Sequence, residues 1–417
     1  MFRSVLVGRQ HVPLIGFVAL LVAFTLGVPS FASADEGPRG PWTSTWGASP
    51  QVPGAPLAIS GQTLRQVAHI SLGGKSVRVR LSNAFGTTSL PVAEARVAIS
   101  SGGSTIIPNT DRRLTFGGSP STIIPPGALV VSDPVSLEVP ALADLAVSLY
   151  FPGALSATTE HSLAEQTTYI SPAGNFAHAS SLPSASTTTT SWYFLNGIEV
   201  EPRFSHPAAI VTLGDSITDG YASTVDANHR WPNYLAARLQ AKRKTSDIAV
   251  VDQGISGNRV LNDFIGPNAL ARFDRDVLAQ SGVNWVIVLE GINDIGIPGA
   301  FGFPTQQVTA DEIIEGHRQL VERAHAKGLA VIGGTLTPFE GTVFPGYYTP
   351  EGEAKRQAVN HWIRTSGVYD AVVDFDKATR DPAHPARLLP AYDSGDHLHP
   401  NDAGYQAMAN AVDLSLF

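Results

Sequence analysis

The second half of the chain alternates short apolar runs with helical patterns, and this rhythm restricts the possible folds more than any other feature. The apolar runs are Ala208–Leu213, Ile248–Val251, Trp285–Leu289, Leu329–Ile332 and Ala371–Val373, and the helical patterns are Trp231–Arg243, Thr309–Lys327, Glu351–Thr365 and Asn401–Leu414. Strands that alternate with helices form a parallel sheet covered by helices on both faces. We therefore expect a three-layer α/β/α domain with a five-stranded parallel, flavodoxin-like sheet over residues 206–417.

The part of the chain before this domain has a different pattern. In Lys75–Leu81, every second residue is apolar, which is typical of a half-buried strand. Similar short runs are Arg96–Ile99, Ala128–Val131, Val135–Val139 and Leu145–Phe151, with turn residues between them. This spacing favours an all-β sandwich or jelly-roll domain over residues 35–205. The polar stretch Ser181–Ser191 is expected to be an exposed loop.

The N-terminus has the pattern of a secretory signal peptide. Arg3 and Arg9 precede the apolar run Val12–Val28, and Ala32–Ala34 supplies small residues of the A-x-A type. We expect residues 1–34 to be removed, which predicts a secreted or periplasmic protein without stable membrane insertion. The alternative is an anchor that is retained, because the run is only just shorter than a membrane-spanning segment.

Composition excludes several kinds of chemistry. The chain has no cysteine, which rules out disulfides, cysteine-ligated metals and a cysteine nucleophile. Its formal net charge is −8, so electrostatics give no reason to expect a nucleic-acid partner, which would need a basic face.

Ligands of such sheets bind beyond the carboxyl ends of the strands, so the residues after each strand are the candidates for chemistry. Gly214–Gly220 follows the first strand, and a serine at this turn, Ser216, can be exposed with its backbone N–H toward the crevice. The Gly-x-Ser-x-Gly elbow is not matched, because Thr218 occupies the last glycine position. Taken alone, the segment is better explained as an ordinary turn and helix N-cap.

The loops after the second and third strands are also ambiguous when each is taken alone. Gln253–Asn258 contains two glycines that allow a backbone N–H to approach a ligand closely. In Glu290–Asp294, the Asn293 amide can donate to a developing negative charge while Asp294 orients the loop. Taken alone, Gln253–Asn258 is better explained as a plain turn between strand and helix, and Glu290–Asp294 is equally compatible with an ordinary turn.

The loop after the fifth strand places a carboxylate and an imidazole three residues apart. In a turn, Asp396 can reach the Nδ1–H of His399, which leaves Nε2 free as a base. The alternatives are a metal pair formed by His397 and His399, which no strong ligand motif accompanies, and a purely structural loop.

Together, these four loops resemble the blocks that define the SGNH hydrolases, also called GDSL esterases and lipases. The matching segments are Gly214–Ile217, Gly254–Asn258, Gly291–Asp294 and Asp396–His399, in the family's order. The resemblance covers about half the chain, and it does not extend to the β-rich part.

The resemblance implies a serine esterase that needs no metal or other cofactor. It implies Ser216 as nucleophile, His399 as general base and then acid, and Asp396 as the residue that orients the imidazole. It further implies an oxyanion hole made of the Ser216 and Gly257 backbone N–H groups and the Asn293 side chain. Asp215 and Asp294 are expected to support loop geometry, and Arg259 either touches substrate or is a solvated surface residue.

The expected substrate is a small-molecule or polysaccharide ester, with a carbohydrate acetyl or other short-chain acyl ester preferred. Ile295–Pro304 and Thr337–Tyr348 carry aromatic residues on what we expect to be long loops, which either shape the pocket or pack onto the domain. The alternatives are a lipase or lysophospholipase, and a carbohydrate-binding protein with a degenerate hydrolase domain. Candidate binding aromatics of the β-rich part, which are equally candidates for its core, are Trp42, Trp46 and Trp192.

Overall fold

The computed structural model describes residues 42–417, so the predicted signal peptide lies outside the described residues. All the described residues belong to one compact unit. None of the helices from residue 42 onward is long and apolar enough to cross a membrane.

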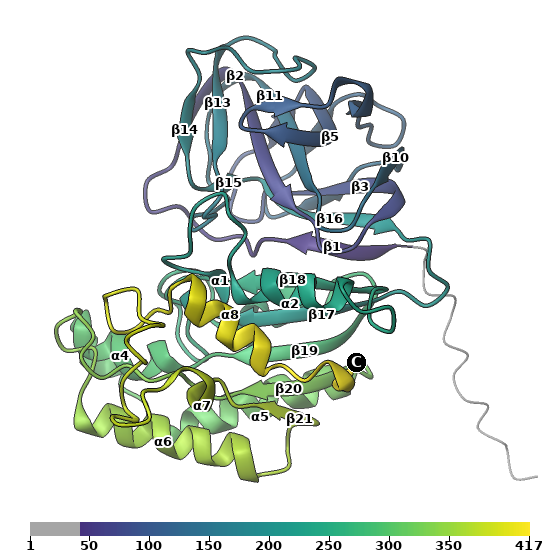
Figure 1. Cartoon of the computed structure of the whole chain (residues 1–417). Coiled ribbons are helices and arrows are strands. Elements are labelled where there is room, and N and C mark those ends of the chain that lie inside the picture. Colours follow the sequence, from purple (N-terminus) through teal and green to yellow (C-terminus); the bar gives the residue numbers. More distant parts are fainter. Residues whose placement is uncertain (1–41) are drawn as a thin grey trace, which may run out of the picture. The chain divides into compact units, whose positions relative to one another are not determined.

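The β-rich part is built from two main antiparallel sheets (Figure 1). One has the order β1-β16-β3-β10, with β9 paired to β3: β1 Thr43–Gly47, β16 Leu195–Glu201, β3 Gly74–Ser82, β10 Val135–Val139 and β9 Leu129–Val131. The other has the order β14-β13-β2-β11-β5-β6, with β7 paired to β5: β14 Thr187–Thr189, β13 Thr168–Ala173, β2 Ala58–His69, β11 Asp144–Ser156, β5 Glu94–Gly102, β6 Thr105–Ile106 and β7 Arg112–Arg113. Two short pairs complete it, β4 Leu90–Val92 with β8 Thr122–Ile124, and β12 Glu160–His161 with β15 Trp192–Tyr193.

The predicted strands are present, and their alternation determines which side chains form the core. On β3, Val77, Val79 and Leu81 are fully buried while Arg78 lies at the partly exposed face. One expectation was wrong: within Ser181–Ser191, the residues Thr187–Thr189 form edge strand β14 against β13. Threonine is β-branched, and such residues suit a pleated edge even when they are too polar for the core.

The second part has the expected parallel sheet, which confirms the α/β prediction. Its order is β18-β17-β19-β20-β21, with β17 Ala208–Gly214, β18 Ile248–Gly254, β19 Val283–Leu289, β20 Ala330–Gly334 and β21 Ala371–Val373. The α-helices are α1 Ser216–Asp219, α2 Trp231–Gln240, α3 Ala269–Phe273, α4 Ile292–Ala300, α5 Ala310–His325, α6 Pro350–Thr365, α7 Phe375–Thr379 and α8 Asp402–Ala411. Short helical turns occur at Pro108–Thr110, Asp274–Leu278, Pro304–Gln306 and Leu414–Leu416.

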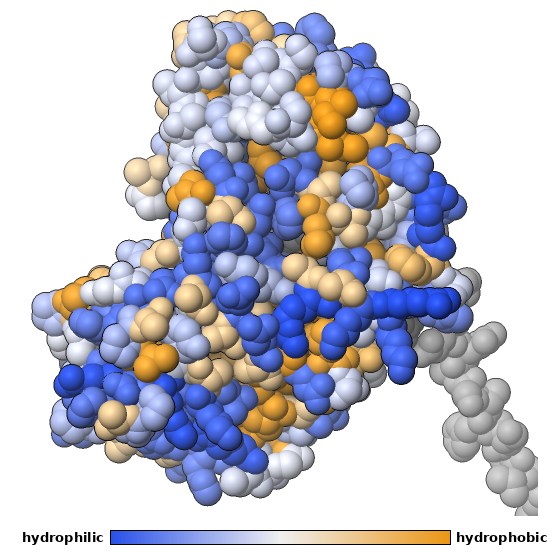
Figure 2. Space-filling model, viewed as in Figure 1, coloured by the Kyte–Doolittle hydropathy of each residue, from blue (hydrophilic) through white to orange (hydrophobic). Residues whose placement is uncertain are grey.

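Helices cover both faces of this sheet (Figure 1). Helices α2 and α8 pack against each other, and α5 packs against α6. Helix α5 begins with a capping box, in which Thr309 and Glu312 bind each other's backbone N–H groups. On the face seen in Figure 2, hydrophobic side chains lie in small patches separated by polar ones.

Strands β17, β18 and β19 end at the same level of the parallel sheet. Gly214, the last residue of β17, pairs with Gly254 at the end of β18 and with Leu289 at the end of β19. The loops that follow these strands therefore leave the sheet side by side.

Candidate active site

Ser216 is the first residue of α1, directly after β17. The side chain of Asp215 caps this helix by accepting a hydrogen bond from the Ile217 N–H at 2.9 Å. Gly214 has no room for a side chain, because a Cβ there would lie 2.2 Å from the Thr218 hydroxyl. This tight turn places the Ser216 hydroxyl at the carboxyl edge of the sheet.

A hydrogen-bonded chain joins three of the residues that the sequence singled out. Ser216 Oγ lies 2.8 Å from His399 Nε2, and His399 Nδ1 lies 2.6 Å from Asp396 Oδ2. The other carboxylate oxygen of Asp396 accepts the backbone N–H groups of Leu398 and His399. Burial alone raises the pKa of Asp396, but these hydrogen bonds and the charge of His399 outweigh it and hold the pKa well below its ordinary value.

This arrangement determines which ring nitrogen of His399 carries the proton. An ionised Asp396 can only accept, so Nδ1 donates its proton to the carboxylate. Nε2 is then an acceptor for the Ser216 hydroxyl. The imidazole is thus oriented to remove a proton from a serine that is a weak nucleophile on its own.

Gly257 and Asn293 line the same pocket as Ser216 and His399. Gly257 has φ of +77°, a conformation that favours glycine. The Asn293 amide nitrogen donates one hydrogen bond to the Asn258 carbonyl at 2.9 Å, and its oxygen accepts one from the Tyr347 hydroxyl at 2.7 Å. A second amide hydrogen of Asn293 is left for a ligand. The sequence predicts Tyr347 only as a pocket or packing aromatic. No local pattern indicates its hydroxyl contact with Asn293, because the two residues are 54 positions apart.

Two buried carboxyl groups, Asp215 and Glu290, lie at the ends of the strands that lead into this site. Burial raises the pKa of Asp215 to about 7, and burial together with the charge of Asp215 raises the pKa of Glu290 well above its ordinary value. Both side-chain oxygens of Glu290 lack a hydrogen-bond partner, and only the position of this residue after β19 could have indicated it from the sequence. Arg272 donates to the carbonyls of Gly214 and Gln253, so it ties the ends of β17 and β18 together.

Asp294 and Arg259 both bind backbone groups of the loop that follows β18. Asp294 accepts the backbone N–H groups of Val260 and Leu261, so it holds the loop after β18. Arg259 is neither solvated nor directed at the pocket: it is buried, and it donates to the carbonyls of Asn262 and Asp263.

The two histidines of the last loop have separate partners. His397 binds Asp393, whereas His399 binds Asp396 and Ser216. Within residues 42–417, no group of three or more His, Asp and Glu side chains is arranged to hold a metal ion.

Aromatic and aliphatic side chains surround the Ser216–His399 pair in a cavity of about 190 Å³. Its apolar lining consists of Tyr221, Phe264, Ile265, Ile297, Phe301, Phe344, Tyr347 and Leu398. The Tyr221 ring lies 4.2 Å from the His399 ring, centre to centre. The predicted loop at Ile295–Pro304 is wrong in part, because helix α4 continues to Ala300 before Phe301 turns into the pocket. Phe339 and Tyr348 instead pack together behind the pocket.

About half of the chain is similar to known proteins. Residues 212–407 match the model of the GDSL-like lipase/acylhydrolase family. An acetylxylan esterase of Geobacillus stearothermophilus is 28% identical over 223 residues, which covers 48% of this chain and 90% of that protein. A crystal structure of an acetylxylan esterase from the same organism is 26% identical, with a TM-score of 0.38, and covers 50% of this chain and 94% of that one. A GDSL-like lipase of Bacteroides thetaiotaomicron is 21% identical, with a TM-score of 0.36, and covers 50% and 89%.

Proposed function

We propose that this protein is a carboxylic ester hydrolase that works through Ser216 as its nucleophile. Its residues 212–407 match the model of the GDSL-like lipase/acylhydrolase family, and a relative is named an acetylxylan esterase. His399 acts as general base and then acid, and Asp396 orients it. The observation that carries this proposal is the continuous hydrogen-bonded chain from Ser216 Oγ through His399 to Asp396.

The reaction proceeds in two halves. Ser216 Oγ attacks the ester carbonyl carbon while its proton passes to His399 Nε2, and the resulting tetrahedral intermediate collapses as His399 protonates the departing alcohol. Water then attacks the acyl-serine with His399 again as base. The second collapse releases the carboxylic acid and restores the Ser216 hydroxyl.

The negative charge on the tetrahedral oxygen needs donors that are already in place. We assign this role to the backbone N–H groups of Ser216 and Gly257 and to the free amide hydrogen of Asn293. Removal of one such donor typically lowers kcat by roughly 100- to 1,000-fold.

The substrate we propose is an acetyl or other short-chain acyl ester on a carbohydrate. In support, a relative is named an acetylxylan esterase, and the pocket carries partly exposed aromatic rings, Phe264 and Phe301, at its lining. The apolar walls around Ser216 suit the acyl group. These same walls also suit a longer chain, so acyl length is the property to measure.

The decisive experiment is the Ser216→Ala variant of the full chain. Hydrolysis of 4-nitrophenyl acetate should fall by at least about a thousandfold, because catalysis without the nucleophile depends only on the oxyanion donors and binding. The fold should persist, as judged by circular dichroism. Unchanged turnover would exclude Ser216 as the nucleophile, and a wild-type protein that resists a serine-directed fluorophosphonate would favour a binding protein instead.

A substrate panel separates the carbohydrate esterase from the lipase. Acetylated xylo-oligosaccharides should be turned over with a higher kcat/KM than the 4-nitrophenyl esters of octanoate and palmitate. A maximum at octanoate or palmitate would instead identify a lipase or lysophospholipase.

We also propose that the protein is exported, on the basis of the charged and apolar N-terminal pattern. N-terminal sequencing of the protein recovered from the medium or periplasm of an expressing bacterium tests this. A mature chain that starts at Asp35 is expected, whereas an intact N-terminus in the membrane fraction would indicate a retained anchor.

A further inference from the structure

One buried carboxylate connects the two backbone segments that supply the proposed oxyanion donors. Asp219 ends helix α1, which begins with Ser216. Its Oδ2 accepts the backbone N–H of Ser256 at 2.8 Å, and Ser256 directly precedes Gly257. The contact is close, because a Cβ on Gly254 would lie 2.3 Å from the Asp219 nitrogen. The Asp219 carboxylate therefore joins the helix that begins with Ser216 to the loop that carries Gly257.

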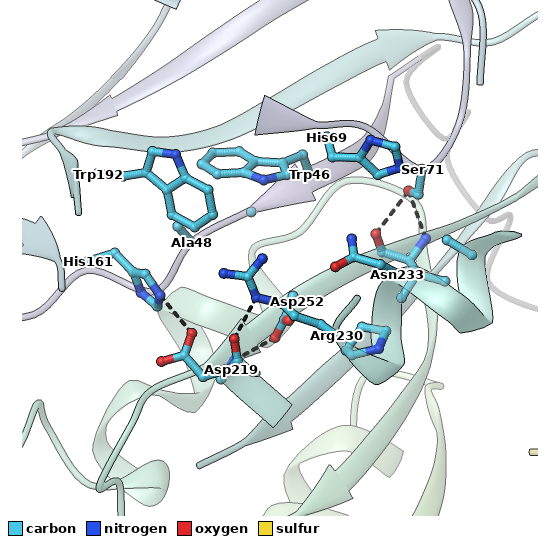
Figure 3. Close-up of a pocket in the computed structure, with 15 residues that line it drawn as sticks. Trp46, Ala48, His69, Ser71, His161, Trp192, Asp219, Arg230, Asn233 and Asp252 are labelled. Carbon is cyan, nitrogen blue, oxygen red and sulfur yellow. Dashed lines mark hydrogen bonds and ion pairs between the residues drawn. The ribbon is translucent and has the colours of Figure 1, made fainter. Parts of the chain in front are cut away.

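The second oxygen of Asp219 is bound by a histidine from the β-rich part (Figure 3). His161 lies on β12 and is buried, and its Nε2 is 2.9 Å from Asp219 Oδ1. Its other ring nitrogen, Nδ1, is 2.9 Å from the carbonyl oxygen of Ser49. The imidazole thus lies between the β-rich part and the segment that carries the nucleophile.

Both partners of His161 are acceptors. A carbonyl and an ionised carboxylate have no proton to give, so both ring nitrogens must carry one, which makes the ring an imidazolium. Burial lowers the pKa of His161, but the charge of Asp219 and the hydrogen bonds to Asp219 and Ser49 outweigh it and raise the pKa above its ordinary value.

The other ionisable groups around the pair act in both directions: Arg230 disfavours the imidazolium, and two carboxyl groups favour it. Arg230 donates from Nε to the Asp219 carbonyl at 2.5 Å and opposes the charge on His161. Glu160 and Asp252 each have a pKa raised by burial to about 7, and their ionisation adds negative charge beside the ring. Further ionisable groups near the pair are Glu165 and His69, and the charge of Asp219 also acts on Asp215 and Tyr405.

We propose that His161 of the β-rich part, in its imidazolium form, is a positioning residue. It orients the Asp219 carboxylate, and Asp219 in turn orients the backbone amides of Ser216 and Gly257. This inference rests on the proposed function. In a neutral ring, one nitrogen carries a lone pair in place of a proton. That nitrogen would face either the Asp219 carboxylate or the Ser49 carbonyl, and the hydrogen bond to that group would be lost. A shift of about 1 Å in a reacting group is enough to reduce a rate about a hundredfold.

Two variants separate the two hydrogen bonds. In His161→Gln the amide nitrogen falls near the position of Nε2 and can still donate to Asp219. In His161→Asn it falls near Nδ1 and can donate only to Ser49. We expect kcat for 4-nitrophenyl acetate to fall about tenfold to a hundredfold in His161→Asn and less in His161→Gln, with KM changed less than about threefold in both.

The matched control is His69→Gln. His69 lines the same pocket and its Nδ1 binds a carboxylate, Asp144, at 2.7 Å, but this pair lies within the β-rich part. Its replacement should leave kcat within about twofold. Equal losses of kcat in the His69 and His161 variants would reduce His161 to a general structural role and overturn the proposal.

The charge state can be tested on the wild-type protein itself. Nitrogen-15 spectra of the histidine rings, assigned by comparison with His161→Gln, should show both nitrogens of His161 protonated at pH 7. The alkaline decline of kcat that accompanies its deprotonation should be absent from His161→Gln. A neutral His161 at pH 7 contradicts the proposal even if the variants do not fold, and an inactive Ser216→Ala beside a fully active His161→Asn contradicts it while the proposed function stands.

Discussion

The side-chain amide of Asn293 is useful to an oxyanion only if its nitrogen, and not its oxygen, faces the pocket. Two neighbours determine this orientation. The Asn258 carbonyl requires the amide nitrogen, and the Tyr347 hydroxyl, which donates at 2.7 Å, requires the oxygen. Without the Tyr347 hydroxyl, the amide oxygen would be a buried acceptor without a partner. Tyr347 therefore stabilises the one rotamer that the proposed chemistry needs.

Tyr347→Phe should accordingly lower kcat for 4-nitrophenyl acetate by about tenfold, a loss of about 1.4 kcal/mol in transition-state stabilisation, and change KM little. The matched control is Tyr348→Phe, because that ring packs on Phe339 behind the pocket. Steady-state kinetics on both variants test the assignment. If both hydroxyl deletions have the same small effect, Tyr347 serves only packing.

A second residue-scale effect concerns Asp252, a buried carboxyl on β18. One oxygen accepts the Gly254 N–H at 2.9 Å, and the other has no partner. Burial raises its pKa to about 7, against an ordinary value of 3.8. The folded state thus holds an extra proton between these two values. The free energy of unfolding contributed by this group falls as pH rises through that window, and the full penalty is present above pH 7.

Asp252→Asn should remove this penalty, because the amide oxygen can still accept from Gly254. We expect the variant to exceed the wild type in the free energy of unfolding at pH 8 by roughly 2–4 kcal/mol, with the difference shrinking toward pH 4. Urea denaturation at both pH values provides the measurement. A difference that is constant with pH would show that Asp252 does not titrate in this range.

At the scale of elements, helix α4 and the segment before α6 fit together only because the helix contains glycine. A Cβ on Gly296 would lie 2.4 Å from the Tyr347 ring, and one on Gly299 would lie 2.3 Å from the Gly346 carbonyl. This glycine pattern is also why the sequence predicted a loop at Ile295–Pro304. Glycine and Pro298 disfavour a helix locally, but close packing against Tyr347 outweighs that preference.

Gly296→Ala is expected to displace the Tyr347 ring and so to reduce kcat as much as Tyr347→Phe does, or more. Alanine is the better helix former by up to about 1 kcal/mol, so loss of the helix is not the cause. A double-mutant cycle measures the coupling. In the Tyr347→Ala background, the same substitution should cost little activity, and an undiminished loss there would place the effect elsewhere.

The arrangement of strands and turns also explains which residues of the candidate site can be predicted from the sequence. Ser216, Gly257 and Asn293 follow strands that end level with one another, so a parallel sheet alone is enough to bring them together. Asp396 and His399 are local in one turn. In contrast, the contact partners of Tyr347 and His161 are 54 and 58 residues away, on elements whose packing no local pattern indicates.

For the whole molecule, the β-rich part and the parallel sheet share one interior. Strand β18 is an edge of the parallel sheet, and the Ser71 hydroxyl from the β-rich part both donates to the Val250 carbonyl and accepts its N–H, each at 2.9 Å. Trp46 and Trp192, for which the sequence left binding and core roles open, are buried and pack edge to face. The change of rhythm near residue 206 marks a change of architecture, but it could not reveal this shared interior, because the contacts join side chains distant in sequence.

Such an interior should make residues 42–417 unfold as one unit. We expect thermal unfolding to give coincident transitions in tryptophan fluorescence, far-UV circular dichroism and esterase activity, because β18 and the residues of the β-rich part that cover its edge cannot be separated without loss of both. A fragment of residues 206–417 alone should aggregate, since an uncovered edge strand is a site of intermolecular pairing. Two well-separated transitions, or a soluble and active fragment, would show instead that the catalytic part is independent of the β-rich part.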